Sequence, residues 1–341
     1  MTQGPYRVDG RTARVWVSDA MEGLARRLGR DPLERLRSMT DCTVWNSIRR
    51  PDAEELRAAL VDQDALLCVL TDQIDAAVME KAQGLRVISS ISVGVDHIDL
   101  DAATQRGIIV TNTPGVLVDT TAELAIALLL AVSRRVVEAD ADVRRGQWTP
   151  EARWQIDGYL GRDLAGATLG LVGLGAIGQA VAARARAFGL RVLGWSRSAR
   201  KVPGVERASL DRVLAESDFV SLHLASTPET RGLIDASALQ AMKPGSVLIN
   251  TARGDLVDES ALMDALAAGH LSGAGLDVFA QEPLPPGHPL FSLPSVVLTP
   301  HIGSATEGTR IRMVDLAVAN LEVALSGQNP VHCANPDVLS R

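Results

Sequence analysis

Short apolar runs alternate with helical stretches through the first third of the chain. The runs that predict strands are residues 14–17, 42–45, 66–70, 85–91 and 108–111. Helices are predicted between them, over residues 21–28, 51–61, 76–82 and 101–105. Continuous apolar strands that alternate with helices are typical of a parallel sheet covered on both faces. Residues up to about Pro114 are therefore expected to form an α/β unit of their own.

The same alternation continues through most of the remaining chain. Further strands are predicted over residues 169–172, 191–195, 219–224, 246–250, 274–278 and 295–298. Helices are predicted over residues 121–143, 179–188, 210–216, 237–242, 259–268 and 305–325. A second α/β unit is thus expected from about Val116 to Pro300. The last helix has no strand of its own, which leaves open a return to the first unit.

Within the second unit, residues 168–198 predict a strand, a glycine turn, a helix and a second strand. Gly173, Gly175 and Gly178 have the spacing G-x-G-x-x-G directly after the first strand. In a dinucleotide-binding unit these glycines allow a tight turn, close approach of a pyrophosphate, and close packing of the helix on the strand. The N-terminus of the helix offers free N–H groups and a partial positive charge to the phosphates. We therefore predict a dinucleotide site, against the alternative of a glycine-rich connection in another kind of α/β protein.

The end of the second strand of this glycine unit indicates which cofactor is used. A site for NAD places an acidic residue there, where it binds the ribose 2′-hydroxyl. Here the residues are Ser196, Arg197 and Ser198. No carboxylate repels a 2′-phosphate, and a guanidinium is present to bind one. NADP(H) is therefore predicted as the preferred cofactor, with use of NAD(H) as the alternative.

Three ionisable residues directly follow strands of the second unit. Arg253 follows residues 246–250, Glu282 follows residues 274–278, and His301 follows residues 295–298. Because parallel strands end at the same edge of a sheet, these side chains can converge beside a nicotinamide. A histidine can donate a proton to a carbonyl, a carboxylate can orient it, and an arginine can bind a substrate carboxylate. Each residue alone could be a solvated or structural charge.

The loop 92–99, SVGVDHID, follows a strand of the first unit. Open α/β sheets bind ligands at this edge, and a turn at Gly94 could leave N–H groups for an anion. An ordinary strand-to-helix loop is the alternative.

Residues 144–164 are irregular and contain Trp148, Trp154 and Tyr159. These aromatics indicate either a protein interface or packing on their own helix.

Composition and charge narrow the possible functions. The chain has 341 residues, of which 46% are hydrophobic and 22% are charged, so a globular protein of two domains is expected. A net charge of −7 gives no support for binding to nucleic acid or to an anionic membrane. Cys42, Cys68 and Cys333 lack the spacing of metal ligands, and no metal site is predicted. The N-terminus lacks the apolar core of a signal peptide, and no apolar run is long enough to span a bilayer, so a cytoplasmic location is expected.

These motifs together resemble the D-isomer-specific 2-hydroxyacid dehydrogenase family over essentially the whole chain. The matching pieces are SVGVDHID, TAELAIALLL, GLVGLGAIG, NTARGDLVDE, GAGLDVFAQEPLP and TPHIGSAT. The resemblance implies two Rossmann-like parallel-sheet domains. A discontinuous, flavodoxin-like substrate domain would comprise residues 1–115 and 302–341, and an inserted dinucleotide-binding domain would comprise residues 116–301. It also implies a homodimer with an arm near residues 118–164.

The resemblance implies specific roles for individual residues. Arg253 would bind the substrate carboxylate and polarise the carbonyl, His301 would be the general acid or base, and Glu282 would orient His301. The backbone of Val93 and Gly94 would hold the substrate carboxylate. The cofactor would be held by Thr121, Gly173, Gly175, Ala176, Ile177, Gly178, Ser196, Arg197, Ser198, Leu224, Ala225, Thr251, Ala252, Asp277 and Gly303. Two other histidines receive no such role: from its place in the sequence, His97 is expected near the mouth of the substrate loop, and His223 is expected to be a core residue within a strand.

Within this family, the serine–arginine cofactor signature and the stretch 282–306 most resemble glyoxylate/hydroxypyruvate reductases. The expected activity is NADPH-dependent reduction of a small 2-keto acid to the D-2-hydroxy acid. A phosphite dehydrogenase, or another D-2-hydroxyacid dehydrogenase that acts oxidatively, is the alternative enzyme. Relatives that oxidise phosphite carry lysine at the position of Val93, which argues against phosphite. A non-catalytic NAD(P)-sensing regulator of the corepressor type is the alternative outside the enzymes.

Overall fold

The chain folds into two compact units. The structure is a computed structural model that describes residues 5–47, 49–151, 153–198 and 201–340. Unit 1 comprises the residues up to Leu117 together with those from Ala305 onward, and unit 2 comprises Val118–Ser304. These boundaries lie a few residues after the expected positions 115 and 301.

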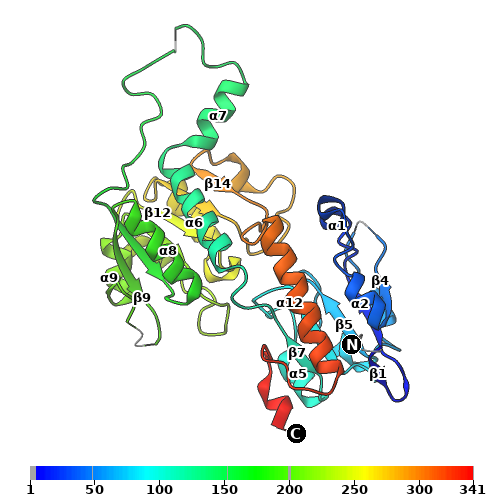
Figure 1. The fold of residues 1–341 in the computed structure, drawn as a ribbon. Helices are drawn as coiled ribbons and strands as arrows, with labels where there is room; N and C mark the ends of the chain where they lie inside the picture. The colour runs from blue at the N-terminus through cyan, green and yellow to red at the C-terminus, as the bar shows by residue number, and fades with distance from the viewer. Residues whose placement is uncertain (1–4, 48, 152, 199–200, 341) are drawn as a thin grey trace. The chain divides into compact units, whose positions relative to one another are not determined.

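Unit 1 contains a parallel sheet of five strands within the described residues (Figure 1). The strands are β3 (Arg14–Val17), β4 (Asp41–Val44), β5 (Ala65–Cys68), β6 (Val87–Ser90) and β7 (Ile109–Thr111). They lie in the order β4-β3-β5-β6-β7, which is 2-1-3-4-5 in chain order. This is the order of flavodoxin-like folds, so the expected fold of the first unit is confirmed. A short antiparallel hairpin, β1 (Arg7–Val8) with β2 (Arg11–Thr12), precedes the sheet and was not predicted.

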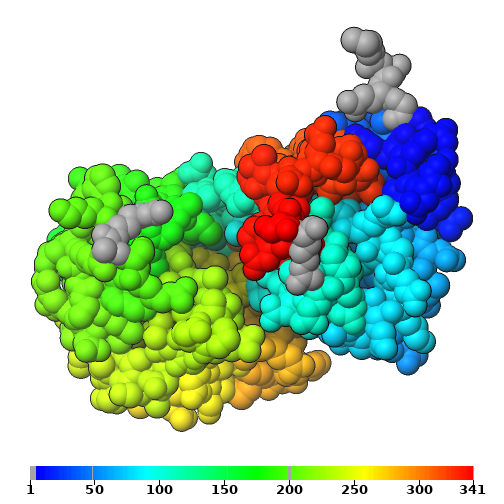
Figure 2. Space-filling model, turned by 90° about the horizontal axis from the view of Figure 1, so that it is seen from below, coloured from blue at the N-terminus to red at the C-terminus, as the bar shows by residue number. Residues whose placement is uncertain are grey.

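Helices cover both faces of the sheet in unit 1. They are α1 (Glu22–Leu28), α2 (Glu34–Met39), α3 (Ala53–Ala59), α4 (Ala76–Glu80), α5 (Leu100–Gln105), α12 (Glu307–Leu325) and the 3-10 helix η3 (Pro336–Ser340). The last helix does return to unit 1, because α12 packs along β5, β6 and β7. In Figure 2 the C-terminal residues, in red, lie against the cyan part of unit 1, where Asn335 binds the backbone of Ile108 and Val110. No helix in the described residues is long and apolar enough to cross a membrane.

Unit 2 contains a parallel sheet of seven strands within the described residues. The strands are β8 (Thr168–Val172), β9 (Arg191–Trp195), β10 (Glu206–Arg207), β11 (Phe219–Leu222), β12 (Val247–Asn250), β13 (Gly273–Leu276) and β14 (Val296–Leu298). They lie in the order β10-β9-β8-β11-β12-β13-β14, or 3-2-1-4-5-6-7 in chain order. This is the Rossmann order with a seventh strand added at one edge, which confirms the expected class of the second unit.

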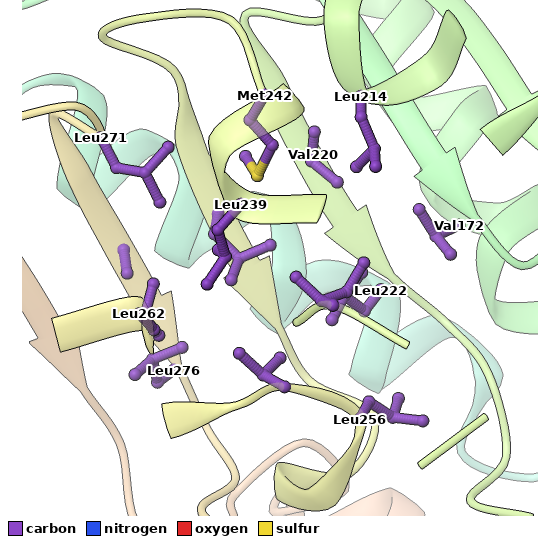
Figure 3. Close-up of a cluster of buried hydrophobic side chains, with 14 of the residues drawn as sticks. Val172, Leu214, Val220, Leu222, Leu239, Met242, Leu256, Leu262, Leu271 and Leu276 are labelled. Carbon is purple, nitrogen blue, oxygen red and sulfur yellow. The ribbon is translucent and has the colours of Figure 1, made fainter. Parts of the chain in front are cut away.

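Two apolar layers enclose the sheet of unit 2. The helices of unit 2 are α6 (Val118–Ser133), α7 (Val136–Arg144), α8 (Ala176–Ala187), α9 (Leu210–Glu216), α10 (Ala236–Ala241) and α11 (Glu259–Ala267), with the 3-10 helices η1 (Gly254–Leu256) and η2 (Pro289–Ser292). One buried cluster joins α6 and α8 to the sheet. The other joins α9, α10 and α11 to the opposite face, where Leu214, Leu239 and Leu262 point toward Val220 and Leu276 (Figure 3). The two layers fix the strand ends that carry the candidate chemistry.

The single helix predicted over residues 121–143 is wrong. Helix α6 ends at Ser133, and α7 begins after Arg135, whose φ of 50° is left-handed. The chain returns to this point, since the N–H of Arg162 donates to the carbonyl of Ser133 at 2.9 Å. A Cβ on Gly161 would lie only 2.3 Å from the same carbonyl oxygen. The carbonyl of Ser133 therefore binds residues 161 and 162 at the point where α6 ends. Helix α7 then projects from the rest of unit 2 (Figure 1).

Candidate active site

The glycine turn after β8 has the geometry that its spacing predicts. Gly173 has a φ of 111°, and a Cβ there would lie 2.4 Å from the carbonyl oxygen of His223. A Cβ on Gly178 would lie 2.1 Å from the carbonyl oxygen of Gly173, so helix α8 packs directly on the turn. A Cβ on Gly175 would meet nothing within 4 Å. Two glycines are thus required by close backbone contacts, whereas the third leaves open space at the start of α8.

The surroundings of that open space suit a dinucleotide. Ala176 and Ile177 form the first turn of α8, whose N–H groups are available to phosphate oxygens. The Oγ1 of Thr251, just after β12, is buried and has no hydrogen-bond partner among the described residues. A buried hydroxyl of this kind usually has a partner, which a bound ligand can supply.

Two further segments expected to contact the cofactor lie at strand ends of the same sheet. Leu224 and Ala225 follow β11, where the hydroxyl of Thr230 donates to the carbonyl of Ala225 at 2.8 Å. The N–H of Ala252, after β12, donates to the side chain of Asn250 at 3.0 Å. Both segments are therefore fixed by local hydrogen bonds, and the residues present fit a dinucleotide.

Cationic side chains gather at the end of β9. Arg197 is well exposed and lies 4.0 Å from the carboxylate of Glu229. The hydroxyl of Ser196 donates to the carbonyl of Ser198 at 2.9 Å, which folds the segment into a compact turn. Arg207, on β10, reaches the carbonyl of Ser196 at 3.5 Å. Sequence reasoning missed Arg207 and Glu229, because neither is near Ser196 in the chain.

Asp277 holds the segment that carries His301. Its carboxylate, 1% exposed, accepts hydrogen bonds from the hydroxyl of Thr299 at 2.6 Å and from the N–H groups of Ile302 and Gly303, both at 2.8 Å. Its own carbonyl accepts from the N–H of His301 at 2.9 Å. Burial raises the pKa of Asp277, although the three hydrogen bonds and the nearby imidazole act in the opposite direction. Through these bonds the end of β13 fixes the loop that follows β14.

The end of the loop after β14, at Gly303, is held by α6. The hydroxyl of Thr121, near the start of α6, donates to the carbonyl of Gly303 at 3.2 Å. A Cβ on Gly303 would lie 3.3 Å from a carboxylate oxygen of Asp277, which is a tight contact. Thr121, Asp277 and Gly303 were expected around the cofactor, and the structure brings all three together.

Glu282 and His301 form a pair. The Nδ1 of His301 lies 2.7 Å from one carboxylate oxygen of Glu282, and the other oxygen accepts the N–H of Phe279 at 3.0 Å. Burial raises the pKa of Glu282, but the hydrogen bond and charge of His301, the N–H of Phe279 and the charge of Arg253 together lower it below its usual value. The carboxylate is therefore held ionised against the imidazole.

Arg253 lies in the same group of charges. Arg253 follows β12, and its side chain donates to the carbonyl of Ala252 at 2.7 Å. The backbone carbonyl of Arg253 in turn accepts from the side-chain amide of Asn250 at 2.8 Å. The charge of Arg253 contributes to the lowered pKa of Glu282, so the guanidinium is within electrostatic range of the carboxylate. The structure thus brings together the three ionisable residues expected from the sequence at one edge of the sheet of unit 2.

The expected substrate loop lies in unit 1, directly after β6. Ser92 is buried, whereas Val93 and Gly94 are half-buried. The side-chain amide of Asn112 donates to the carbonyl of Val93 at 2.7 Å. His97, expected near the mouth of the loop, is instead 5% exposed and lies beneath it, with Nε2 3.1 Å from the hydroxyl oxygen of Ser90.

His223 lies just after β11 rather than within the strand. Its Nε2 is 2.9 Å from the hydroxyl oxygen of Ser221. Burial lowers the pKa of His223 to about 4, so the ring is neutral at neutral pH. It therefore supports the glycine turn as an uncharged residue.

A family comparison agrees with this geometry. The model of the D-isomer specific 2-hydroxyacid dehydrogenase NAD binding domain matches residues 126–303, which fall within unit 2. The chain belongs to this family. It is accordingly an oxidoreductase with an NAD(P)-binding Rossmann domain.

Relatives that share most of the chain support the assignment. A glyoxylate reductase of Thermofilum pendens is 50% identical over 313 residues, which cover 90% of this chain and 92% of that protein. The crystal structure of the TT0316 protein from Thermus thermophilus has a TM-score of 0.83 at 48% identity, covering 94% of this chain and 99% of that one. An NADPH-dependent glyoxylate/hydroxypyruvate reductase from Sinorhizobium meliloti, solved with NADP and malonate, has a TM-score of 0.83 at 34% identity, covering 94% and 96%.

Proposed function

We propose that this protein reduces a small 2-keto acid of the glyoxylate or hydroxypyruvate type to the D-2-hydroxy acid, with NADPH as preferred reductant. The observation that carries this proposal is the 2.7 Å pair of His301 and Glu282 beside Arg253, at the strand ends of a dinucleotide fold. A carbonyl reduction needs a proton donor and a charge that polarises the carbonyl, and this group supplies both.

His301 is the proposed proton donor in reduction and proton acceptor in oxidation. Its Nδ1 faces Glu282, so Nε2 is the nitrogen that exchanges a proton with the substrate oxygen. The carboxylate of Glu282 lies 2.7 Å from Nδ1 and orients the ring. Asp277 accepts hydrogen bonds from the backbone N–H groups of His301 and Ile302, so the ring is positioned before substrate arrives.

Arg253 and the loop after β6 are the proposed substrate ligands. The Arg253 guanidinium binds the substrate carboxylate and draws electron density from the carbonyl oxygen. In unit 1, the backbone N–H groups of Val93 and Gly94 are the proposed ligands of the substrate carboxylate. In this assignment unit 1 is the substrate domain and unit 2 is the cofactor domain.

The cofactor is assigned to the glycine turn and the neighbouring strand ends. When bound, the reduced nicotinamide supplies the hydride. The phosphates are assigned to the start of α8, at Gly175, Ala176 and Ile177, and the nicotinamide to the side of Thr251 and Asp277. Arg197 and Ser196 are assigned to the 2′-phosphate, which is the basis for the proposed preference for NADPH.

A homodimer is proposed through the arm near residues 118–164. The arm exposes apolar side chains that monomers usually bury: Trp148 (64% exposed), Trp154 (78%), Ile156 (80%) and Leu160 (65%). Large exposed apolar side chains gathered in one segment are typical of a protein interface. A second copy of the chain is the proposed partner.

Turnover with purified protein tests the proposal. Glyoxylate, hydroxypyruvate and larger 2-keto acids are each mixed with NADPH and with NADH, and loss of the reduced-nicotinamide absorbance is followed. We expect turnover with the two small acids and a higher kcat/KM with NADPH. Binding of NADPH without reduction of any 2-keto acid would instead favour a sensing role, and a preference for NADH would overturn the cofactor assignment.

His301→Ala and Arg253→Ala test the assigned roles. Each substitution removes a group that acts on the reacting carbonyl, so each is expected to lower kcat/KM by about a hundredfold or more. NADPH binding, followed by the quenching of protein fluorescence, serves as the control for folding. Turnover at the wild-type level in either variant would contradict the role given to that residue.

A further inference from the structure

Four successive carbonyl groups in the loop after β6 are tied down by hydrogen bonds. The carbonyl of Ser92 accepts from the backbone N–H of Thr113 at 2.8 Å and from its hydroxyl at 3.0 Å. The carbonyl of Val93 accepts from the amide of Asn112 at 2.7 Å, and that of Gly94 accepts from the hydroxyl of Ser92 at 2.6 Å. The next carbonyl, of Val95, accepts from a backbone N–H at 3.0 Å.

This arrangement sets the direction of the N–H groups. In a planar trans peptide the carbonyl of one residue and the N–H of the next point in opposite directions. Tying the carbonyls of Ser92, Val93 and Gly94 therefore turns the N–H groups of the three following residues the other way. Within the described residues, none of the N–H groups of Val93, Gly94 and Val95 donates a hydrogen bond. Successive unpaired N–H groups on one side of a loop form a concave site for an anion.

A row of buried polar side chains, Ser90 and His97, lies behind the loop and holds the hydroxyl of Ser92. The hydroxyl oxygens of Ser92 and Ser90 are 2.7 Å apart, and that of Ser90 lies 3.1 Å from Nε2 of His97. All three side chains are at most 5% exposed. Ser92 is thus held in one rotamer, in which it can donate to the carbonyl of Gly94.

Asn112 is supported in a similar way from α12. Its side chain holds the carbonyl of Val93, and its own carbonyl accepts the side-chain amide of Asn320 at 2.9 Å. Ser92, within the loop itself, and Asn112, in the segment after β7, therefore hold the loop from two different parts of unit 1. Each of the two central carbonyls has a dedicated side-chain donor.

We infer that Ser92 and Asn112, with Ser90 and His97 behind Ser92, are positioning residues for substrate binding. They do not touch the substrate. They keep the carbonyls of Val93 and Gly94 from rotating into the site, where an oxygen would repel the substrate carboxylate. This inference rests on the proposed function, because it assigns the loop N–H groups to the carboxylate of a 2-keto acid.

The chain offers a matched control for this role. Ser89 precedes Ser90 in β6 and is equally buried, but its hydroxyl donates to the carbonyl of Ala317 in α12 at 2.7 Å. Ser89→Ala therefore removes a buried hydroxyl from the same strand without releasing a loop carbonyl. Ser92→Ala removes the donor to Gly94, and Asn112→Ala removes the donor to Val93 at a half-buried position that tolerates truncation more easily.

The test compares substrate KM, kcat and the affinity for oxalate, a small anion that carries the same carboxylate as a 2-keto acid. One lost orienting hydrogen bond is expected to raise the KM for glyoxylate and the Kd of oxalate by about tenfold in Ser92→Ala and in Asn112→Ala. We expect kcat to change less, and the Kd of NADPH to remain at the wild-type value. Ser89→Ala is expected to leave KM and the oxalate Kd unchanged.

Two outcomes would overturn the inference. One is a wild-type KM and oxalate Kd in both Ser92→Ala and Asn112→Ala. The other is evidence for general loosening of the fold. Such evidence would be a rise in KM and oxalate Kd in Ser89→Ala as large as that in Ser92→Ala, or a loss of NADPH affinity in Ser92→Ala and Asn112→Ala. If the wild-type protein reduces no 2-keto acid, the proposed function fails instead, and oxalate binding measured by calorimetry still tests the loop.

Discussion

Replacing Glu282 by glutamine removes one negative charge while it keeps the size of the side chain. In the wild-type protein one carboxylate oxygen lies 2.7 Å from Nδ1 of His301, and the other is held by the N–H of Phe279. Glutamine can still accept the hydrogen bond of Phe279 through its amide oxygen. The substitution therefore tests the charge on His301 more than the shape of the loop.

The expected loss follows from the distance and exposure of the pair. Two unit charges about 4 Å apart attract by about 4 kcal/mol at an effective dielectric constant of about 20. The two side chains are 26% and 29% exposed, so water screens part of that attraction. A hydrogen bond to a charged group contributes about 1.5–3 kcal/mol, and we take 2–3 kcal/mol as the order of magnitude. At about 1.36 kcal/mol per tenfold in rate, kcat/KM should fall by about 30- to 150-fold.

The assay is the kcat/KM for glyoxylate at saturating NADPH, with Glu259→Gln as control. Glu259 lies 3.2 Å from Nε2 of His288 and accepts the N–H of Ala280 at 3.3 Å, so it is a second glutamate–histidine pair that contacts the same loop. We expect Glu259→Gln to retain nearly all activity. A Glu282→Gln variant that keeps wild-type kcat/KM, or a Glu259→Gln variant that loses as much, would refute the reasoning.

Three further predictions concern the cofactor, a buried histidine and the arm. Arg197→Ala should raise the KM for NADPH by about tenfold and leave that for NADH nearly unchanged, as steady-state kinetics would measure. His223 should remain neutral between pH 5 and 8 in an NMR titration. Because its folded pKa of about 4 is below the unfolded value of about 6.5, it should reduce stability by up to about 3 kcal/mol as pH falls between those values, a decline that His223→Asn should lack in urea unfolding. Trp154→Ala combined with Ile156→Ala should shift the protein toward monomer in sedimentation velocity, whereas Phe291→Ala, at a 55% exposed residue outside the arm, should not.

The strands were predictable because both faces of each parallel sheet are covered. Strands such as β5 and β12 are buried at every position, which gives continuous apolar runs with polar residues at their ends. The strand ends then carried the candidate chemistry, so Arg253, Glu282 and His301 could be named from the sequence. The glycine turn was predictable for a different reason, since its backbone contacts exclude any Cβ at Gly173 and Gly178.

Other features depend on contacts that a local pattern does not contain. The break between α6 and α7 arises where residues 161 and 162 return to Ser133, about thirty residues later in the chain. Helix α2 buries only Leu36, and β10 has two exposed residues, so neither has the periodicity that predicts an element. Arg207 on β10, which reaches Ser196, and Glu229 after β11, which lies near Arg197, were missed because neither is near its partner in the chain.

The position of His301 depends on Asp277, a residue that was expected from the sequence to contact the cofactor. His301 has a φ of 53°, a left-handed conformation that costs a residue with a Cβ about 1–2 kcal/mol. Asp277 offsets this with a backbone bond to His301 and carboxylate bonds to the next two N–H groups. A carboxylate that is almost fully buried is unfavourable unless such donors surround it, and Thr299 supplies one more. The strained histidine and the buried acid therefore stabilise each other, and together they bring the ring to Glu282.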